Sequence, residues 1–494
     1  MSESTIKEII DLAIQYHRAG ALFEAEKLYI EALKQNPTSA NSLNLLGLVK
    51  YQQQLFDDAI FYIKKAVEIT PNAYSYENLG RIYFDTGKFD ESIHFYKKAI
   101  ELESNNFELW FGIAIAYKNK KNLDKAIKSY QKAMDLKPGF THIYFNLARI
   151  YFEKNDIPSA IDCYKKILEY KPDDEDTLYY LGTMYLITQN FEEGWKYFEN
   201  RISKKFSIAS RQKTCPSSVL SQPVWNGELL ENKTLYVYYE AGYGDTIHFA
   251  RYLPLLKARA AKVLFKPQPS LINLFKDSNL NVEILDNKMP ESTLKFDAHI
   301  PIMSLPYALG LNFEDIPFKK GYLKANPDKI KLYKEKYFRN DKLKIGIKWL
   351  GNPLCNQNRA IPFEKFFSLL NLPNTKFYSV QKEAGTEKLI NFPQNQEIIS
   401  LGETFNDFSD TAGTLENFDL IICNDTSIAH LAGALGKQCF VLLPFEPEWR
   451  WFLDINYSPW YDSIKIFRQK EPDNWDDVFE RVYKELEKLL SAAS

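Results

Sequence analysis

The chain has 494 residues, which at roughly 150 residues per domain predicts about three domains. Hydrophobic residues make up 45% and charged residues 26%, which excludes a wholly disordered chain. Lysine and arginine total 62 against 64 aspartates and glutamates, and the net charge of -2 leaves no basic field with which to bind nucleic acid.

The N-terminus and the cysteines indicate the cellular compartment in which the protein works. Residues 1–8 have neither the basic start nor the apolar core of a signal peptide, and no later run reaches the roughly eighteen apolar residues of a membrane span. The five cysteines and six histidines are scattered without metal-ligand spacing, so we expect reduced thiols and no metal. These patterns predict a soluble, cytoplasmic protein without a transmembrane segment.

Residues 1–205 contain an internal repeat. Small residues recur every 33 or 34 positions, at Ala13, Gly47, Gly80, Ala114, Ala148 and Gly182. A second small residue follows each of them by twelve positions, and four copies close with a proline. Small residues let two antiparallel helices approach closely, and proline ends the second helix. The period therefore predicts about six helical hairpins.

This pattern resembles the tetratricopeptide repeat (TPR). The resemblance implies an α-solenoid over residues 1–205, with a concave groove that binds a peptide or a partner protein. In the nucleocytoplasmic O-GlcNAc transferases, which carry the same repeats, an asparagine ladder grips the peptide backbone. Asn78 and Asn146 match that ladder here, whereas the equivalent residues of the other copies do not.

After the array the pattern changes. Residues 206–231 are rich in Ser, Pro, Gln and Gly and end near Trp225, which predicts a linker held down by its tryptophan. Short β-rich runs then alternate with helical stretches, which predicts parallel sheets of βαβ units. The predicted strands are 234–239, 262–266, 282–285, 298–301, 344–349, 376–380, 420–423 and 439–443.

The spacing of these strands predicts two domains. A gap near residues 325–340 separates two doubly wound, Rossmann-like domains, 232–338 and 339–494, the second of which ends in a C-terminal helix. We expect a ligand cleft between them, where the carboxyl ends of the strands converge.

The first candidate site follows the first predicted strand. Residues 239–249 run through Gly242 and Gly244 into a helix, and the glycines permit a tight turn with close backbone approach. Ile247 stands where a dinucleotide fingerprint needs its third glycine. Asp245 either acts on a ligand or only caps the helix. His248 either lines the cleft or is a partly buried helix residue.

The second candidate site is residues 419–436, where a buried strand ends in a polar turn and a helix of small residues begins. A helix N-terminus offers free backbone amides and the positive end of a dipole, which suits a diphosphate. Asp425, Thr426 and Ser427 either bind this anion or only cap the helix. His430 either faces the ligand or packs.

Other polar residues follow the strands of the second domain. Lys348 and Asn352 follow its first strand, Arg359 comes soon after, and Gln381 ends the next strand. Their positions predict donor contacts in the cleft. Aromatic and arginine-rich stretches at 449–451, 458–461 and 467–469 occupy similar positions, although Arg and Trp also stack structurally.

From about residue 223 onward the chain resembles bacterial TPR proteins with a GT-B glycosyltransferase domain related to the ADP-heptose:lipopolysaccharide heptosyltransferases. The matching motifs are Gly-Asp-Thr-Ile-His-Phe-Ala-Arg-Tyr-Leu-Pro at 244–254, Trp-Leu-Gly-Asn-Pro at 349–353, Asp-Phe-Ser-Asp-Thr-Ala at 407–412, Asp-Thr-Ser-Ile-Ala-His-Leu-Ala-Gly-Ala-Leu-Gly at 425–436, Trp-Arg-Trp at 449–451 and Ser-Pro-Trp-Tyr at 458–461.

The resemblance implies an inverting, metal-independent glycosyltransferase that takes a nucleotide sugar as substrate and needs no cofactor. It implies Asp245 as the general base for the acceptor hydroxyl, with Gly242, Gly244 and His248 on the acceptor side of the cleft. On the donor side it implies Asp425, Thr426, Ser427 and His430, together with a cation, Lys348 or Arg359. Inversion needs such a base and an electrostatic clamp for the leaving diphosphate.

Our leading hypothesis is a glycosyltransferase that modifies a protein recruited by the TPR groove. The array would then select the acceptor, and the cleft would be built from residues beyond it. The alternatives are a glycan or lipopolysaccharide glycosyltransferase whose repeats dock on a complex, a non-catalytic TPR scaffold with a degenerate GT-B domain, and a GT-B epimerase of nucleotide sugars. The intact motifs around Asp245 and Asp425 argue against degeneracy.

Overall fold

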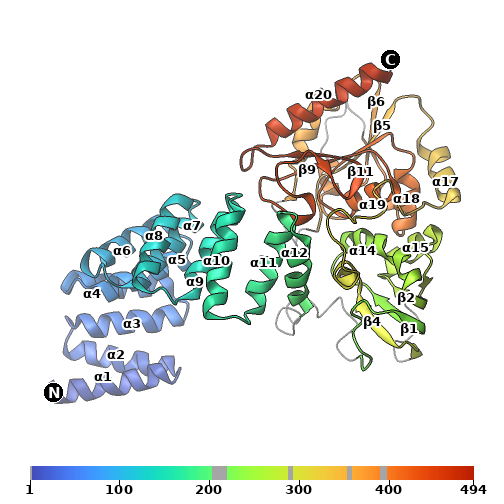
Figure 1. Cartoon of the computed structure of the whole chain (residues 1–494). Coiled ribbons are helices and arrows are strands. Elements are labelled where there is room, and N and C mark those ends of the chain that lie inside the picture. The colour runs from blue at the N-terminus through green and yellow to red at the C-terminus, as the bar shows by residue number, and fades with distance from the viewer. Residues whose placement is uncertain (1–2, 203–219, 287–292, 353–358, 390–397, 494) are drawn as a thin grey trace. The chain divides into compact units, whose positions relative to one another are not determined.

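The computed structural model describes residues 3–202, 220–286, 293–352, 359–389 and 398–493. The chain forms two compact units, Met1–Pro172 and Asp173–Ser494. The first unit is helical, and Figure 1 shows its successive helix pairs in blue to green. Its helices are α1 (Glu3–Arg18), α2 (Leu22–Gln35), α3 (Ala40–Gln52), α4 (Phe56–Ile69), α5 (Ala73–Asp85), α6 (Phe89–Leu102), α7 (Phe107–Asn119), α8 (Leu123–Leu136), α9 (Thr141–Glu153) and α10 (Ile157–Tyr170).

The predicted small residues are the points where paired helices touch. A Cβ atom added to Gly47 would lie 2.4 Å from Cγ1 of Ile63, and one added to Gly80 would lie 2.9 Å from the ring of Tyr96. Side-chain caps set the starts of several helices, and Asn72, for example, accepts a 2.9 Å hydrogen bond from the backbone N–H of Ser75. The predicted array of helical hairpins is confirmed.

The second unit begins with a further helix pair, which is the sixth repeat. It consists of α11 (Glu175–Ile187), α12 (Phe191–Phe198) and a 3-10 turn, Glu199–Ile202. The sequence placed a boundary at residue 205, but the compact units divide between residues 172 and 173. The sixth repeat therefore belongs to the same compact unit as the α/β region, because side chains of this repeat are buried against that region.

The predicted linker is described only from residue 220, and residues 206–219 lie outside the described part of the chain. In the described part Trp225 is 1% exposed, and its indole N–H donates to the carbonyl of Glu228 at 2.8 Å. The backbone N–H of Trp225 donates to the carbonyl of His299 at 2.8 Å. The tryptophan therefore holds this segment down as predicted.

Two sheets follow. The first is parallel, in the order β3-β2-β1-β4, and the second has the order β10-β11-β9-β8-β5-β6-β7, parallel except for the pair β10–β11. The strands are β1 (Leu230–Tyr238), β2 (Ala260–Lys266), β3 (Glu283–Ile284), β4 (Ala298–Pro301), β5 (Leu343–Lys348), β6 (Thr375–Ser379), β7 (Ile398–Ser400), β8 (Leu420–Asn424), β9 (Cys439–Leu443), β10 (Tyr457–Ser458) and β11 (Tyr461–Arg468).

All eight predicted strands are present, which confirms the parallel α/β character of this region. β7, β10 and β11 were not predicted. The ends of β11 lie in two stretches noted in the sequence, 458–461 and 467–469, and between them exposed Asp462 and half-buried Lys465 stand beside buried Ile464 and Ile466. Strand β11 is an inner strand, paired with β9 and β10.

The strand order reverses at β5 and β8 in the second sheet and at β1 and β4 in the first. Parallel α/β sheets bind ligands outside the carboxyl ends of such strands. The helices of the region are α14 (Tyr243–Phe249), α15 (Ile272–Ser278), α16 (Leu305–Ala308), α17 (Pro327–Tyr337), α18 (Phe408–Leu415), α19 (Ser427–Leu435) and α20 (Trp475–Ala493).

The C-terminal helix α20 covers one face of the second sheet. Val478, Phe479, Val482 and Leu486 are all at most 3% exposed and pack in one apolar cluster with residues of β5, β8 and β9. Among the described helices, none is long and apolar enough to cross a membrane. The cysteines of the described part, Cys163, Cys423 and Cys439, are free and buried.

Candidate functional site

The two motifs singled out in the sequence pack against each other in the second unit. Helix α14 starts after β1, and α19 starts after β8. A Cβ atom on Gly244 would lie 3.1 Å from Cδ2 of His430 and 3.4 Å from Cα of Ser427. Glycine at 244 therefore allows the start of α14 to approach the start of α19 closely.

Asp245 has two partners. Its Oδ2 accepts a hydrogen bond from the backbone N–H of Gly242 at 2.9 Å, which completes the cap of α14. Its Oδ1 forms an ion pair with the guanidinium of Arg450. The carboxylate is 24% exposed. Asp245 is therefore a cap, as one reading of the sequence held, and also one half of an ion pair between distant segments.

Arg450 is mostly buried and contacts several side chains. Its Nη1 lies 2.5 Å from Oε1 of Glu448, its guanidinium stacks on the ring of Trp449 at 4.1 Å, and its carbonyl accepts from the indole N–H of Trp460 at 2.6 Å. Burial alone would lower the pKa of Arg450, but the carboxylates of Glu448 and Asp245 outweigh it and raise the pKa above its ordinary value. Burial raises the pKa of Glu448 despite this partner.

Asp425 faces a second arginine. Its Oδ2 lies 2.7 Å from Nη1 of Arg359, a close charge contact without the angles of an aligned hydrogen bond. Burial opposes ionisation of Asp425, but Arg359 and His430 outweigh burial and lower its pKa. The side chain of Asn424 donates to the carbonyl of Arg359 at 2.9 Å and so fixes the backbone beside this contact.

A small cavity lies at the carboxyl ends of β8, β9 and β11. Its volume of about 20 Å³ admits roughly one water molecule. Burial lowers the pKa of Arg468, at the end of β11, to about 10. The wall thus carries two arginines and three carboxylates among its residues, which are Arg359, Asp425, Leu443, Pro444, Glu446, Pro447, Glu448 and Arg468.

His248 and His430 meet at one hydroxyl. The Nδ1 atoms of both rings lie 3.2 Å from the hydroxyl oxygen of Tyr461, and the two side chains are 0% and 4% exposed. Burial lowers the pKa of His430 to about 4 and that of His248 well below its ordinary value. A hydroxyl has one proton to donate, so at most one of the two imidazoles accepts from Tyr461 and at least one donates to it. This cluster joins α14, α19 and β11.

The remaining donor-side residues lie near the switch point of the second sheet. Lys348 ends β5, and burial lowers its pKa to about 8. Gln381 is 1% exposed, and its amide bonds the backbone of Leu350 and Ala384, so it braces the loop after β5. Asn352 lies in this loop and is exposed.

The polar turn before α19 leaves its first amides without a side-chain cap. Thr426 is the N-cap residue and makes no cap hydrogen bond through its side chain. Its hydroxyl donates instead to the carbonyl of Asn424 at 3.4 Å. Ser427, the first residue of α19, is half-buried. The expectation that these residues receive a diphosphate stays a prediction.

The two ladder asparagines lie in the first unit. Asn78 is 1% exposed, donates to Oδ1 of Asn44 at 3.4 Å and accepts from Arg81 at 3.0 Å. Asn146 accepts from the ammonium of Lys118 at 3.2 Å and donates to the carbonyl of His142. Both amides therefore bond within the array.

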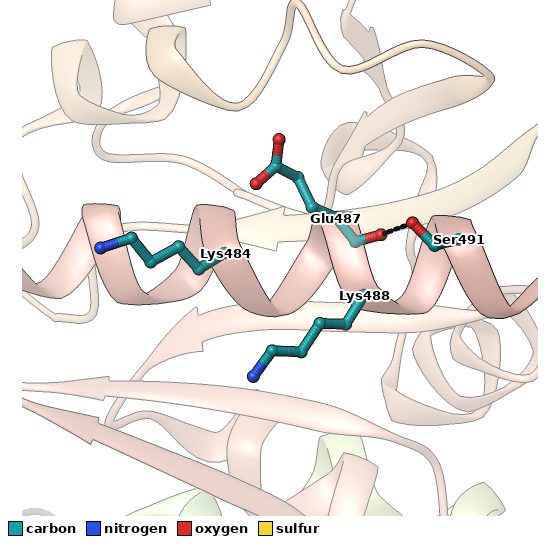
Figure 2. Close-up of a pocket in the computed structure, with 4 residues that line it drawn as sticks. All are labelled: Lys484, Glu487, Lys488 and Ser491. Carbon is teal, nitrogen blue, oxygen red and sulfur yellow. Dashed lines mark hydrogen bonds between the residues drawn. The ribbon is translucent and has the colours of Figure 1, made fainter.

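A second depression lies on the surface of α20. Figure 2 shows Lys484, Glu487, Lys488 and Ser491 on this one helix, with the hydroxyl of Ser491 donating to the carbonyl of Glu487 at 2.8 Å. The lysines pair with Glu480 and Glu485 along the same helix. The residues that line this depression all belong to α20, so we assign them no function. In the described residues no group of three His, Cys, Asp or Glu side chains could hold a metal ion.

Part of the surroundings of Asp245 was not predicted. Arg450 and Arg468 lie in stretches that were noted in the sequence without an assigned role, and Glu448, which directly precedes the first of them, was missed. Trp195 and Arg201 of the sixth repeat were missed altogether, although both depart from the pattern of the other repeats. The residue at the position of Trp195 is isoleucine in repeats two to five, and the one at the position of Arg201 is alanine in repeats one to four.

Comparison with known proteins identifies the repeats. Residues 11–74 and 120–181 match families described as tetratricopeptide repeat, and residues 80–121 match one described as TPR repeat. A curated relative, Protein FlbA of Caulobacter vibrioides, is 25% identical over 328 residues, which are 61% of this chain and 53% of FlbA. The chain thus spans about half the length of this relative.

Two similar solved structures each cover about a third of the chain. The crystal structure of MamA is 27% identical with a TM-score of 0.32 and covers 33% of this chain and 96% of its own. YrrB, described as a TPR protein with an unusual peptide-binding site, is 21% identical with a TM-score of 0.32 and covers 35% of this chain and 89% of its own. The family matches establish that the N-terminal part of the chain carries tetratricopeptide repeats.

Proposed function

We propose that the second unit is an inverting, metal-independent glycosyltransferase of the GT-B type, and that the TPR array recruits its protein acceptor. The observation that carries this proposal is the convergence of Asp245, Arg450, Asp425 and Arg359 at the carboxyl ends of strands from two parallel sheets. A transferase of this kind needs a base on one side of its site and cations on the other.

The carboxylate and the cations of the site have different roles in the proposed reaction. Asp245 takes the proton of the acceptor hydroxyl as that oxygen attacks the anomeric carbon, and the bond from this carbon to the nucleoside diphosphate breaks. Arg359, Arg468 and Lys348 lie on the donor side and neutralise the leaving diphosphate. Closure of such a site excludes water and strengthens these charge contacts.

Calorimetry with nucleoside diphosphates in the presence of a chelator tests the donor site. We expect binding by the wild-type chain and at least tenfold weaker binding by Arg359→Met. Lys484→Met on the surface of α20 is the matched control and should bind like the wild type. Binding that requires an added divalent cation, or no binding of any nucleoside diphosphate, would contradict the proposal.

Mass spectrometry of acceptor proteins tests the transfer itself. Candidate acceptors are incubated with the full-length chain and a panel of nucleotide sugars, and a mass increase of one sugar is expected on a protein. Transfer only to free glycans or lipopolysaccharide would favour the alternative in which the repeats dock the enzyme on a complex.

A second candidate function is a non-catalytic TPR scaffold. One observation favours it, because both carboxylates of the site are already engaged by arginines and the cavity beside them admits roughly one water molecule. An enzyme would have to open these contacts when it binds its substrates. Nucleotide binding without transfer to any acceptor would support the scaffold.

A further inference from the structure

The sixth repeat carries two side chains that the other repeats lack. Trp195 stands where repeats two to five have isoleucine, and Arg201 stands where repeats one to four have alanine. Both are buried, at 2% and 7% exposure. The residues equivalent to Trp195 in repeats two to five are Ile60, Ile93, Ile127 and Ile161. Those equivalent to Arg201 in repeats one to four are Ala32, Ala66, Ala99 and Ala133.

Arg201 holds the segment that leads to Asp245. Its Nη2 lies 2.7 Å from Oε1 of Glu240, and its Nε donates to Oε2 at 3.2 Å, so the guanidinium grips this carboxylate with two bonds. Its Nη1 pairs with Glu199 at 2.6 Å. Glu240 follows β1 and precedes Asp245 by five residues. The arginine therefore anchors the loop that carries Asp245 to the sixth repeat.

Trp195 supports Arg450, the ion-pair partner of Asp245. Its ring contacts Trp449 edge to face at 5.6 Å and Phe249, the last residue of α14, at 6.1 Å. The guanidinium of Arg450 stacks on Trp449. The indole N–H of Trp195 is buried without a hydrogen-bond partner. Isoleucine would avoid that unpaired donor, so the tryptophan is explained by its reach to Trp449.

We propose that the sixth repeat sets the geometry of the Asp245–Arg450 pair, with Trp195 and Arg201 as positioning residues. One side chain fixes the loop that leads to Asp245, and the other fixes the aromatic ring under Arg450. The catalytic consequence rests on the function proposed above, whereas the structural coupling does not. The last repeat is then part of the site as well as the end of the array.

Hydrogen exchange of the full-length chain tests the coupling without any activity. The variant Trp195→Ile restores the residue of the other repeats, and amide exchange should accelerate at least tenfold in residues 240–249 and 448–452. Trp195→Phe keeps a shorter ring and should give an intermediate acceleration, which keeps the test open if the isoleucine variant does not fold. Tyr164→Leu, at a buried position of the fifth repeat, is the control and should leave both segments unchanged.

The exchange results decide the proposal directly. Acceleration confined to these two segments supports it. Unchanged exchange in a folded Trp195→Ile chain, or unchanged exchange in Trp195→Phe if that is the only folded variant, overturns it. Acceleration of equal size throughout the second unit also overturns it, because Trp195 would then contribute only general stability.

Transfer kinetics test the catalytic consequence. For Trp195→Ile we expect kcat to fall at least tenfold while KM for the nucleotide sugar stays within about twofold, because a misplaced base slows chemistry without removing donor contacts. An unchanged kcat overturns the positioning role. A wild-type chain that transfers no sugar refutes the proposed function instead, and the exchange experiment still decides the coupling.

Discussion

At the scale of single residues, each carboxylate oxygen of Asp245 has its own partner. One oxygen caps α14 through the N–H of Gly242, and the other faces Arg450. The two readings of the sequence, cap and reactive carboxylate, are therefore compatible.

Replacing this carboxylate should separate the two roles. Asp245→Asn keeps the size and most of the capping ability, so the chain should fold and bind nucleoside diphosphate as before, while kcat falls by about 10²- to 10⁴-fold. Arg450 keeps Glu448 as a partner in this variant. Asp462→Asn, on the exposed side of β11, is the control. Near-normal turnover of Asp245→Asn would show that another group is the base.

The buried histidines predict a dependence of stability on pH. The pKa of His430 is about 4 in the folded chain and roughly 6.5 in the unfolded chain. As the pH falls below 6.5 the unfolded state binds the proton first, so the free energy of unfolding decreases until the pH reaches about 4. The loss is at most about 3.5 kcal/mol for this group, at about 1.4 kcal/mol per pH unit.

Urea unfolding at a series of pH values measures this effect. His430→Gln has no imidazole at this position, so the decrease between pH 6.5 and 4 should be smaller than in the wild type. His142→Gln, at an exposed position of α9, should leave the slope unchanged. Equal slopes in wild type and His430→Gln would mean that other groups carry the pH dependence.

At the scale of helices and strands, the copies of the repeat differ in how well the same glycine position tolerates an added side chain. Gly47 and Gly182 occupy the position that holds alanine in three other repeats. A Cβ atom on Gly182 would lie 2.6 Å from the backbone nitrogen of Phe198, whereas the nearest atom to one on Gly47 is in the side chain of Ile63. A side chain yields more easily than a backbone.

We therefore expect Gly182→Ala to destabilise the second unit by about 1–3 kcal/mol through overpacking. Gly47→Ala should change the stability of the first unit by less than about 1 kcal/mol, because the helix propensity gained by alanine offsets part of the contact. Urea unfolding of the two variants measures both. A larger loss of stability for Gly47→Ala than for Gly182→Ala would show that the backbone of α12 moves to accommodate the methyl group added at residue 182.

At the scale of the whole molecule, the division of the chain predicts which fragments fold. A fragment of residues 173–494 retains the sixth repeat. A fragment of residues 207–494 loses Arg201, which leaves Glu240 buried without its cation, and it uncovers Trp449. Breaking a buried ion pair costs about 3–5 kcal/mol, so we expect a cooperative thermal transition only for the longer fragment.

Calorimetry of the two fragments measures this difference, and nucleoside diphosphate binding of the longer one tests whether the donor site needs the first five repeats. A cooperative transition of the shorter fragment within a few degrees of the longer one would contradict the assignment of the sixth repeat to the second unit. It would also restore the expectation from the sequence that the site is built only from residues beyond the array.

The sequence by itself determined the local features of this protein. A period of 33 or 34 residues, with small residues where helices touch, predicted the helical hairpins, and runs of β-formers located eight of the eleven strands in the described residues. These features depend on residues that are close together in the sequence, so the spacing of residue types is enough to predict them. The strands β7 and β10, of three and two residues, were not predicted. β11 was missed because only its two ends, in the stretches 458–461 and 467–469, were considered.

Only the tertiary structure decided which residues meet. Asp245 and Arg450 are 205 residues apart, and His248 and Tyr461 are 213 apart, so no local pattern could pair them. The place of the sixth repeat was decided in the same way. Its period matches the array, but Trp195 and Arg201 find their partners in the α/β region. A buried charge must lie beside its counterion, and the path of the whole chain determines where that counterion is.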